Sequence, residues 1–373
     1  MLLVEADGKA LFQQAGIQVP AGVVVGKGES LALSGAGPWM VKAQVPVGGR
    51  GKAGGVVRCV DAEAVHAALA RQLGLRLKGH AVQACLVEQA AAGMERYLAL
   101  VIDPAGYGVR ALFSAAGGVD IEQADNVESR LCPPDADAIA AAFAELAARE
   151  PDAWRGALVA TGRRLAGLML SHELLLAEIN PLFVGGHGCV AGDAKVVVDL
   201  NAFDRQPELA ALLRARPGIY ADAVRKLDEG FDYVELDPEG EVGLVTTGAG
   251  LSMMLVDEMT ARGMKPLNFL DIRTGQLRGS PARLIRVLEW IAAAPRVKVV
   301  LVNIFAGITD LGEFARLLAD AVEQTPALRV PIVARLVGRG AAEARRVLSE
   351  RMPGLAVEEE LDAALARVAR AAA

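Results

Sequence analysis

Hydrophobic and polar positions follow two different patterns, one before and one after about residue 225. After the Arg216-Pro-Gly turn, short apolar runs alternate regularly with stretches in which apolar residues recur at helical spacing. The apolar runs are 242–247, 267–271, 297–303, 329–336 and 355–357, and the helical stretches are 221–229, 251–262, 282–294, 311–324, 341–351 and 359–371. Continuous apolar strands that alternate with helices are typical of a parallel sheet covered on both faces. Residues 226–373 are therefore predicted to form a doubly wound α/β domain.

The first part of the chain, residues 1–225, mixes strands and helices less regularly. Strands are predicted at 39–45, 56–60, 82–88, 96–102, 109–114, 174–179 and 189–198. Helices are predicted at 8–16, after the polar cap Asp61, and twice between 135 and 171. This order fits an α+β domain with helices outside a mixed sheet, so the whole chain is expected to be an α/β protein of two domains.

Composition narrows the classes of partner. The 373 residues are 53% hydrophobic, which is enough to bury large cores. The net charge of −6, with cations scattered along the chain, argues against nucleic acid or a membrane as the main partner. The four widely spaced cysteines predict neither a zinc site nor a disulfide framework, and residues 1–25 lack the pattern of an export signal. We expect a cytosolic protein that binds a small molecule or another protein.

A glycine-rich loop follows a lysine at the end of an apolar strand. Residues 41–55 are Val-Lys-Ala-Gln-Val-Pro-Val-Gly-Gly-Arg-Gly-Lys-Ala-Gly-Gly. Glycines allow main-chain N–H groups to approach a phosphate, and Lys42, Arg50 and Lys52 supply positive charge. The segment matches neither the P-loop nor the dinucleotide-binding pattern. It indicates either a phosphate-binding loop or a solvated glycine-rich hairpin.

Oxygen-bearing side chains gather at the end of a second predicted hairpin. Glu178-Ile-Asn-Pro181 ends one strand, and Gly192-Asp-Ala-Lys195 lies on the strand expected beside it. Asn180 and Asp193 would then lie side by side, as a Mg²⁺ held between protein and nucleotide phosphates requires, with Glu178 as a third oxygen group. Taken alone, the pattern also fits an ordinary hairpin end with a turn-forming Asn-Pro.

Other segments are weaker candidates for ligand contacts. Glu88 and Glu95 lie next to apolar strands, where a carboxylate either binds a ribose or adenine amine or simply lies at the surface. The segments 246–250 and 303–309 each follow a buried strand and precede a helix. Such turns line the ligand crevice of a doubly wound sheet, although ordinary turns also contain glycine.

Several motifs follow one another in a characteristic order along nearly the whole chain. They are V-K-A-Q-V with G-G-R-G-K-A-G-G-V, L-V-E, E-I-N-P-L, G-D-A-K, N-A-F-D-R-Q-P-E-L, G-A-G-L, N-F-L-D and V-L-V-N-I-F-A-G-I. Together they resemble the β subunit of succinate–CoA ligase and its malate–CoA ligase relatives. The resemblance implies an ATP-grasp domain over residues 1–225 and a flavodoxin-like CoA-ligase domain over residues 226–373.

The resemblance also implies roles for individual residues. The phosphates of ATP or ADP would be held by Lys42, Gly49, Arg50 and Gly51, and the nucleotide pocket would be lined by Glu88 and Glu95. Mg²⁺ would be bound by Asn180 and Asp193. The residues that would face the acyl-substrate site are Thr247, Gly307, Ile308 and Thr309. The implied reaction converts a small carboxylic acid to an acyl phosphate and then to a thioester with CoA. A histidine of a partner α subunit carries the phosphoryl group, and Glu178 contacts that phosphohistidine. The α subunit also binds most of the CoA.

The sequence departs from the family pattern in its second part. Thr247 replaces an asparagine, the segment 272–278 brings two arginines in place of glycines, and Asp310 replaces a cation. Because Asp310 would repel a distal carboxylate unless Arg273 restores the charge, one hypothesis is an acid other than succinate, such as malate. Neutral change in these loops is the other interpretation.

Two further functions remain alternatives at this point. A single-chain ATP-grasp carboxylate–amine ligase would use the first domain similarly but would not need a CoA-type second domain. A non-catalytic nucleotide-sensing or CoA-sensing module would have little chemical use for Lys42, Glu178, Asn180 and Asp193 together. The leading prediction is the β subunit of a heteromeric, ATP-dependent acid–thiol ligase.

Overall fold

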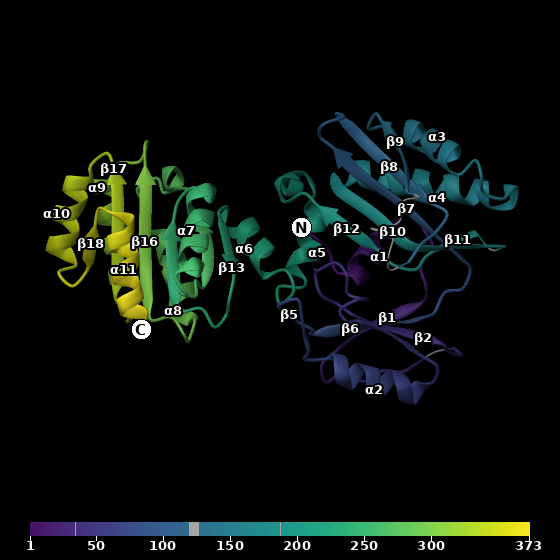
Figure 1. Cartoon of the computed structure of the whole chain (residues 1–373), viewed down its shortest axis with the longest axis horizontal. Helices are drawn as coiled ribbons and strands as arrows, with labels where there is room; N and C mark the ends of the chain where they lie inside the picture. Colours follow the sequence, from purple (N-terminus) through teal and green to yellow (C-terminus); the bar gives the residue numbers. More distant parts are fainter. Residues whose placement is uncertain (34, 119–126, 187) are drawn as a thin grey trace. The chain divides into compact units, whose positions relative to one another are not determined.

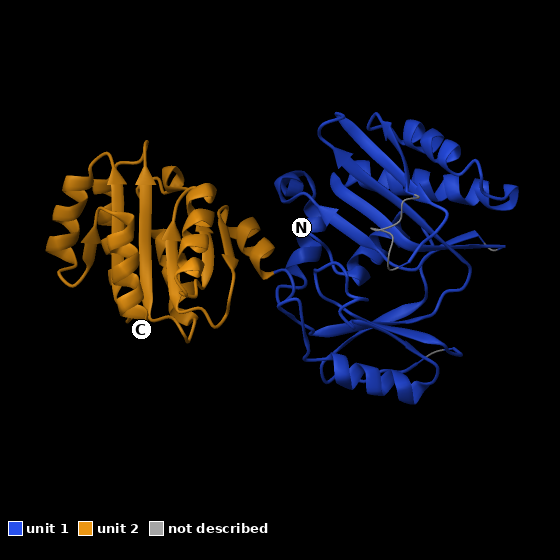
Figure 2. Cartoon of the chain, in the orientation of Figure 1, with its two compact units in different colours: residues 1–220 blue, residues 221–373 orange. Residues whose placement is uncertain are grey.

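The computed structural model describes residues 1–33, 35–118, 127–186 and 188–373. The chain divides into two compact units, Met1–Tyr220 and Ala221–Ala373 (Figure 2). This division comes slightly before the boundary expected near residue 225. Helix α6 (Ala221–Glu229) packs against β13 (Asp232–Glu235) and so belongs to the second unit.

A four-stranded antiparallel sheet with one covering helix forms part of the first unit. Its order is β1 (Gly22–Gly26), β6 (Ala84–Gln89), β2 (Trp39–Ala43) and β3 (Val56–Cys59). Helix α2 (Ala62–Gln72) packs on this sheet because its apolar side, including Val65, shares a core with Val41 of β2. As predicted, Asp61 caps α2 by accepting a hydrogen bond from the Ala64 N–H at 2.8 Å. The short strands β4 (Arg76–Leu77) and β5 (His80–Ala81) follow.

A six-stranded sheet forms the rest of the first unit. Its order is β11 (Gly188–Ala191), β10 (Leu174–Gly185), β7 (Met94–Asp103), β8 (Gly108–Ser114) and β9 (Glu128–Cys132), and β12 (Lys195–Val198) also pairs with β10. Helices α3 (Ala136–Leu146) and α4 (Asp152–Ser171) pack against each other and on this sheet (Figure 1). Helix α1 (Glu5–Gln14) contacts β12, and η2 (Leu200–Arg205) and α5 (Pro207–Arg214) complete the unit.

The strand predicted at 189–198 is two strands in the structure. β11 and β12 pair with different halves of β10, and residues 192–194 form a break between them. The pairing of β10 with β7 shifts register in the same region, between Ile179 and Leu182. The break is tied to β10 by a hydrogen bond of 2.8 Å from the Gly192 N–H to the Pro181 carbonyl. Asp193 is therefore presented by an interruption of the sheet and not by a regular hairpin strand.

The second unit contains a parallel sheet with helices on both faces. The strand order is β14 (Val242–Thr246), β16 (Val299–Ala306), β17 (Ile332–Gly338) and β18 (Ala356–Glu358). Val300 and Val302 enter one core with α8 (Ala282–Ala293), α9 (Leu311–Glu323) and α10 (Ala341–Arg351). Val299 and Leu301 enter the other core with α7 (Ala249–Ala261) and α11 (Leu361–Ala372), and α11 packs against both β16 and β17. The predicted doubly wound α/β fold is confirmed, and no helix in the described ranges is long and apolar enough to cross a bilayer.

One strand predicted for the parallel sheet of the second unit has a different pairing in the structure. β15 (Asn268–Asp271), expected in the parallel sheet, pairs antiparallel with β13. The buried Asn268 side chain connects it to β14, accepting from the Leu244 N–H at 2.9 Å and donating to the Leu244 carbonyl at 3.0 Å. These amide bonds lie between two main-chain hydrogen bonds, from the Leu267 N–H to the Val242 carbonyl at 2.8 Å and from the Ile272 N–H to the Thr246 carbonyl at 3.1 Å. The short helix η3 (Thr274–Gln276) follows β15.

Candidate functional site

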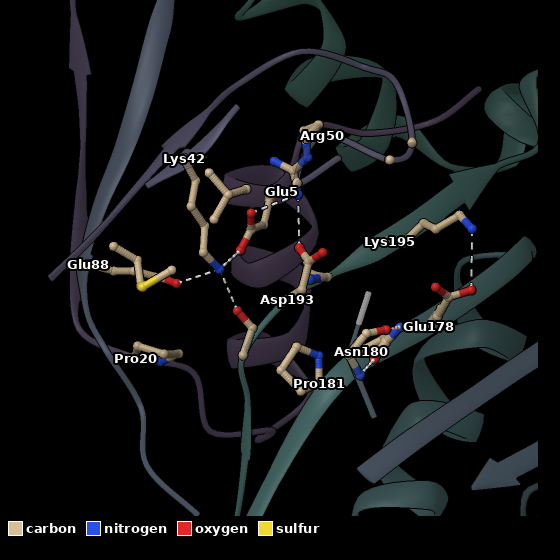
Figure 3. A pocket seen from close by; sticks show the side chains of 18 of the residues that line it. Glu5, Pro20, Lys42, Arg50, Glu88, Glu178, Asn180, Pro181, Asp193 and Lys195 are labelled. Atoms are coloured by element: carbon tan, nitrogen blue, oxygen red, sulfur yellow. Dashed lines mark hydrogen bonds and ion pairs between the residues drawn. The ribbon is translucent and has the colours of Figure 1, made fainter. Parts of the chain in front are cut away.

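Residues from both sheets of the first unit line a cavity of about 470 Å³ (Figure 3). The residues assigned from the sequence to the nucleotide, the metal and phosphoryl transfer in this part of the chain all line it: Lys42, Gly49, Arg50, Gly51, Glu88, Glu95, Glu178, Asn180 and Asp193. Glu5, which the sequence analysis did not single out, lines it as well. The structure therefore brings together segments that are far apart in the sequence.

Two lysines and two glutamates form a buried cluster at one wall of the cavity. Lys42 Nζ lies 2.7 Å from Glu5 Oε1 and 2.8 Å from Glu88 Oε1, and it donates to the Gly192 carbonyl at 2.6 Å. Lys9 Nζ contacts the same three residues at 2.8, 2.7 and 2.9 Å. All four side chains are buried. We call Glu5, Lys9, Lys42 and Glu88 the lysine–glutamate cluster.

Local structure explains why these four side chains meet. α1 begins at Glu5, earlier than predicted, so Glu5 and Lys9 lie one turn apart on the same side of the helix. On the sheet, Glu88 pairs across with Met40, and Lys42 stands two residues further along β2, so both side chains point to the same face. The Glu-x-x-x-Lys spacing near the start of the chain was the available signal for the two residues that the sequence analysis missed.

The glycine-rich segment is a hairpin loop whose arginine folds back into the cavity. It joins β2 to β3 and is closed by a hydrogen bond of 2.8 Å from the Ala43 N–H to the Gly55 carbonyl. The Arg50 guanidinium donates to Ala43 O at 3.1 Å, to Glu5 Oε2 at 2.8 Å and to Asp193 Oδ1 at 2.9 Å. Its side chain is only 10% exposed. The loop is thus a hairpin, as one interpretation held, but Arg50 is not solvated.

The charges in the cavity perturb one another strongly. Burial alone would raise the pKa of Glu5, but Lys42, Lys9 and Arg50 outweigh burial and hold that pKa well below its usual range. Burial alone would lower the pKa of Lys42, but Glu5, Glu88 and Asp193 raise it above its ordinary value. Asp193 shows the opposite balance, because burial and the nearby Glu5 raise its pKa despite the cations. Glu5 and Lys42 are therefore both charged at neutral pH.

The metal-ligand candidates come from β10 and from the break after β11. The Asn180 amide is held by Gly118, whose N–H donates to Oδ1 at 2.7 Å and whose carbonyl accepts from Nδ2 at 3.0 Å. Asp193 Oδ1 accepts from Arg50 and from the Ala194 N–H. Among the described residues, no group of three or more His, Cys, Asp or Glu side chains forms a metal cage. Two hard oxygen ligands in one cavity fit a Mg²⁺ that takes its other ligands from phosphates and water.

Glu178 and Glu95 occupy other parts of the cavity wall. Glu178 Oε2 lies 3.4 Å from Lys195 Nζ across the β10–β12 pair, so a cation accompanies this carboxylate. Glu95 is exposed at the start of β7. Glu88, in contrast, has both carboxylate oxygens bonded to lysines of the cluster. The two acids that the sequence grouped together therefore differ in their surroundings.

Three threonines meet at the carboxyl ends of the strands in the second unit. The hydroxyl of Thr274 lies 2.9 Å from that of Thr309 and 3.4 Å from that of Thr247, and the Thr274 N–H donates to Thr247 Oγ1 at 3.3 Å. We call these residues the threonine row. Two of them, Thr247 and Thr309, are substrate candidates from the sequence, and Thr274 was missed. Gly307 and Ile308, the other two candidates, are exposed in the neighbouring turn.

Arg273 and Asp310, the charged residues by which these turns depart from the family pattern, both have partners within the second unit. Arg273 Nη2 donates to Asp232 Oδ2 at 2.9 Å. Asp310 caps α9, accepting from the N–H groups of Gly312 and Glu313 at 3.0 and 3.1 Å. Both charges are therefore used to hold local structure. Whether Asp310 repels a distal carboxylate, with Arg273 compensating, stays a prediction.

Comparison with known proteins gives matches along nearly the whole chain. Residues 2–184 match the family model described as ATP-grasp domain, and residues 245–369 match the one described as CoA-ligase. The chain is 33% identical to the succinate–CoA ligase [ADP-forming] β subunit of Desulfurococcus amylolyticus, with 99% of this chain and 98% of the relative covered. It is 37% identical to that of Chloroflexus aurantiacus, with 94% of each covered.

Solved structures show the same fold at lower sequence identity. The ATP citrate lyase of Methanothrix soehngenii, in complex with citrate and coenzyme A, superposes with a TM-score of 0.73 at 18% identity, covering 96% of this chain and 95% of the other. At this level of identity the match establishes the arrangement of secondary structure and carries no statement about ligands.

Proposed function

This chain belongs to the family of succinate–CoA ligase β subunits, and we propose that the cavity of its first unit is the nucleotide site of the enzyme. The chain is a subunit of an ATP-dependent acid–CoA ligase that works with an α subunit. The CoA-ligase match over residues 245–369 favours this function over a stand-alone carboxylate–amine ligase, which has no need of such a domain.

One observation supports the nucleotide assignment above all. Buried cations from the β2–β3 hairpin, Lys42 and Arg50, share one cavity with the oxygen ligands Asn180 and Asp193, and in Figure 3 Arg50 is bonded to Asp193 directly. A nucleotide polyphosphate needs cations beside its oxygens, and Asn180 and Asp193 would hold a Mg²⁺ that supplies further positive charge there. This combination of charges serves a phosphate ligand better than a neutral one.

The proposed roles follow from this arrangement. Lys42, Arg50 and the main chain at Gly49 and Gly51 bind the phosphates, and Asn180 and Asp193 hold Mg²⁺. Mg²⁺, when bound, neutralises the charge that develops on the phosphate oxygens. Glu95 contacts the nucleoside at the edge of the cavity, and Glu88 acts on the nucleotide through Lys42. ATP or ADP is the proposed nucleotide.

In the proposed reaction, the phosphoryl group of ATP is transferred to a residue of the partner subunit. We propose that a histidine of the α subunit attacks the terminal phosphate of ATP, releasing ADP. Glu178 accepts a hydrogen bond from the other ring N–H of that histidine and so fixes the ring with its attacking nitrogen unprotonated. The phosphoryl group then passes to the carboxylate of the acid, and the CoA thiol displaces phosphate from the acyl phosphate to give the thioester.

The second unit supplies the proposed acid-facing turns. Thr247, Gly307, Ile308 and Thr309 lie at the carboxyl ends of β14 and β16, the edge at which doubly wound sheets bind ligands. The substrate is a small carboxylic acid, with succinate and malate as the candidates, and the α subunit binds most of the CoA. The four cysteines are free thiols, which supports a reducing cytosol as the compartment.

A reconstituted pair of subunits tests the proposal. The chain, purified with its α subunit, should form ADP and a CoA thioester when supplied with ATP, Mg²⁺, CoA and a panel of small acids. The α subunit should become phosphorylated on histidine when acid and CoA are omitted. Formation of amides from acid and amine by this chain alone would instead support the single-chain ligase.

A further inference from the structure

We propose that Lys9 is a positioning residue of the nucleotide site, which keeps Glu5 and Glu88 neutralised when Lys42 turns toward the nucleotide phosphates. The inference rests on the proposed function of the cavity. It assigns Lys9 a role that acts through Lys42 and does not require Lys9 to touch the nucleotide.

Lys42 has no hydrogen-bond donor to spare in this structure. An ammonium group carries three N–H donors, and Lys42 Nζ has three acceptors, on Glu5, Glu88 and the Gly192 carbonyl. To bind a phosphate oxygen, Lys42 must release at least one of them. Each released acceptor is buried, and a buried carboxylate without a partner is strongly unfavourable.

Lys9 contacts the same three acceptors as Lys42. Its ammonium group lies 2.8 Å from Glu5 Oε1 and 2.8 and 2.7 Å from the two oxygens of Glu88, and it donates to Gly192 O at 2.9 Å. When Lys42 turns away, none of the three is left without a cation or a donor. Lys42 lines the cavity, whereas Lys9 is not among the described residues that line it, so only Lys42 is placed to reach a ligand.

Arg50 differs from Lys42 because it does not have to leave its partners. A guanidinium group carries five N–H donors, and the Arg50 bonds to Ala43, Glu5 and Asp193 use fewer than that. It can therefore add a phosphate contact while it holds both carboxylates. The need for a substitute cation is specific to Lys42.

The balance of charges around Lys42 predicts whether loss of Lys9 weakens or strengthens nucleotide binding. Lys9, Lys42 and Arg50 face three carboxylates, those of Glu5, Glu88 and Asp193, so this group of six charges is neutral overall. Removal of Lys9 leaves one excess negative charge, which both retains Lys42 more tightly and repels a polyphosphate. Removal of the Glu5 charge has the opposite effect on both.

Binding of Mg·ADP to the full chain, measured by calorimetry, tests the inference without relying on catalysis. Lys9→Met should raise the Kd for Mg·ADP by about tenfold or more, as expected for one unscreened charge close to the phosphates. Lys9→Met combined with Glu5→Gln restores the charge balance and should recover most of the lost affinity. Lys27→Met removes an exposed lysine outside the cavity and is the matched control, with unchanged binding.

The outcomes separate the inference from a purely structural role. If Lys9 only supported the fold, the double variant would bind more weakly than Lys9→Met, because it removes more native bonds, and that result would overturn the proposal. If Lys9→Met does not fold, Glu5→Gln alone decides, since it should bind Mg·ADP at least as tightly as the unsubstituted chain, and weaker binding contradicts the inference. Failure of the unsubstituted chain to bind Mg·ADP would remove the proposed function and this inference together.

Discussion

The carbonyl oxygen of Gly192 accepts a hydrogen bond from Lys42 at 2.6 Å, and only glycine fits at the position that offers this carbonyl. A Cβ atom on Gly192 would lie 2.4 Å from Cε2 of Phe183 and 2.9 Å from the Pro181 carbonyl. Gly192 thus joins the break between β11 and β12 to the lysine–glutamate cluster, because its small size allows the close approach.

We predict that Gly192→Ala weakens both the fold and nucleotide binding. The forced shift of Phe183 and of the main chain should lower the free energy of unfolding by about 1–3 kcal/mol. The displaced carbonyl should also raise the Kd for Mg·ADP. Denaturant unfolding and calorimetry measure the two effects. Gly156→Ala is the control, because this exposed helical glycine has open space around it and alanine there should stabilise α4 by up to about 1 kcal/mol. Equal effects of the two substitutions would contradict the packing argument.

Lys42→Met should greatly slow phosphorylation of the α subunit. The variant loses the cation proposed to bind the transferred phosphate, so label transfer from ATP should slow by about 100-fold or more. Phosphorylation of the α subunit by radiolabelled ATP measures this directly. Lys27→Met should transfer label at the unsubstituted rate, since Lys27 is exposed and outside the cavity. Undiminished transfer by Lys42→Met would remove Lys42 from the mechanism.

The sequence predicted the second unit well because its signal is local. Buried strands alternate with amphipathic helices, and each element can be recognised from its own residues. The exception is β15, which pairs antiparallel with β13 and is joined to β14 by the Asn268 side chain between main-chain bonds of Leu267 and Ile272. No local pattern distinguishes a buried asparagine with this function from one in an ordinary turn.

The first unit was harder to predict because its site depends on contacts distant in sequence. Lys9 meets Glu88 across 79 residues, and Lys42 meets Glu5 across 37. The family motifs identified Lys42 and Glu88, but the Glu-x-x-x-Lys pair of α1 looks like any solvent-exposed helical ion pair. The break at residues 192–194 was also missed, because its cause lies in the two separate pairings with β10.

Glu5→Gln should destabilise the fold in a pH-dependent way. The pKa of Glu5 is lowered on folding, because Lys42, Lys9 and Arg50 together outweigh burial, so its stabilisation is present above the unfolded pKa of about 4.5 and is lost as the pH falls through the folded value. At pH 7 the substitution should cost about 3 kcal/mol, as for removal of one member of a buried ion pair. Thermal unfolding against pH measures the difference, which should shrink below the unfolded pKa. A difference independent of pH would contradict the charge argument.

Asp193→Asn should act in the opposite direction on stability. Burial and the negative charge of Glu5 raise the pKa of Asp193, so its ionised form is unfavourable in the folded chain above the raised value and has no such effect below the ordinary value of 3.8. The substitution should therefore raise the Tm at pH 7 to 8, and this gain should disappear in acid. Mg²⁺-dependent nucleotide binding should weaken in the same variant, since asparagine lacks the charge that favours Mg²⁺.

Asp204→Asn, at an exposed position outside the cavity, is the control for Asp193→Asn and should alter neither the Tm nor nucleotide binding. A fall in the Tm of Asp193→Asn at pH 8 would show that the ion pair with Arg50 outweighs burial. In that case Asp193 would favour both the stability of the fold and the binding of Mg²⁺.

Thr274→Val should change the selectivity of the enzyme for its acid. The variant keeps the shape of the side chain and removes the hydroxyl that joins Thr247 to Thr309. A hydroxyl both donates and accepts hydrogen bonds, so the threonine row is better matched to a hydroxyl group of an acid than to a second carboxylate, which only accepts. We therefore expect the kcat/KM for malate to fall by about two- to tenfold relative to succinate, the range for one hydrogen bond.

The KM for ATP separates this effect from general damage. Because Thr274 belongs to the second unit and the nucleotide cavity to the first, Thr274→Val should leave the KM for ATP unchanged, and Thr274→Ser, which restores the hydroxyl, should recover the selectivity. Parallel losses for malate and succinate would mean that the threonine row only supports the turn. Equal kinetics of Thr274→Val and the unsubstituted enzyme with both acids would place the acid away from the row.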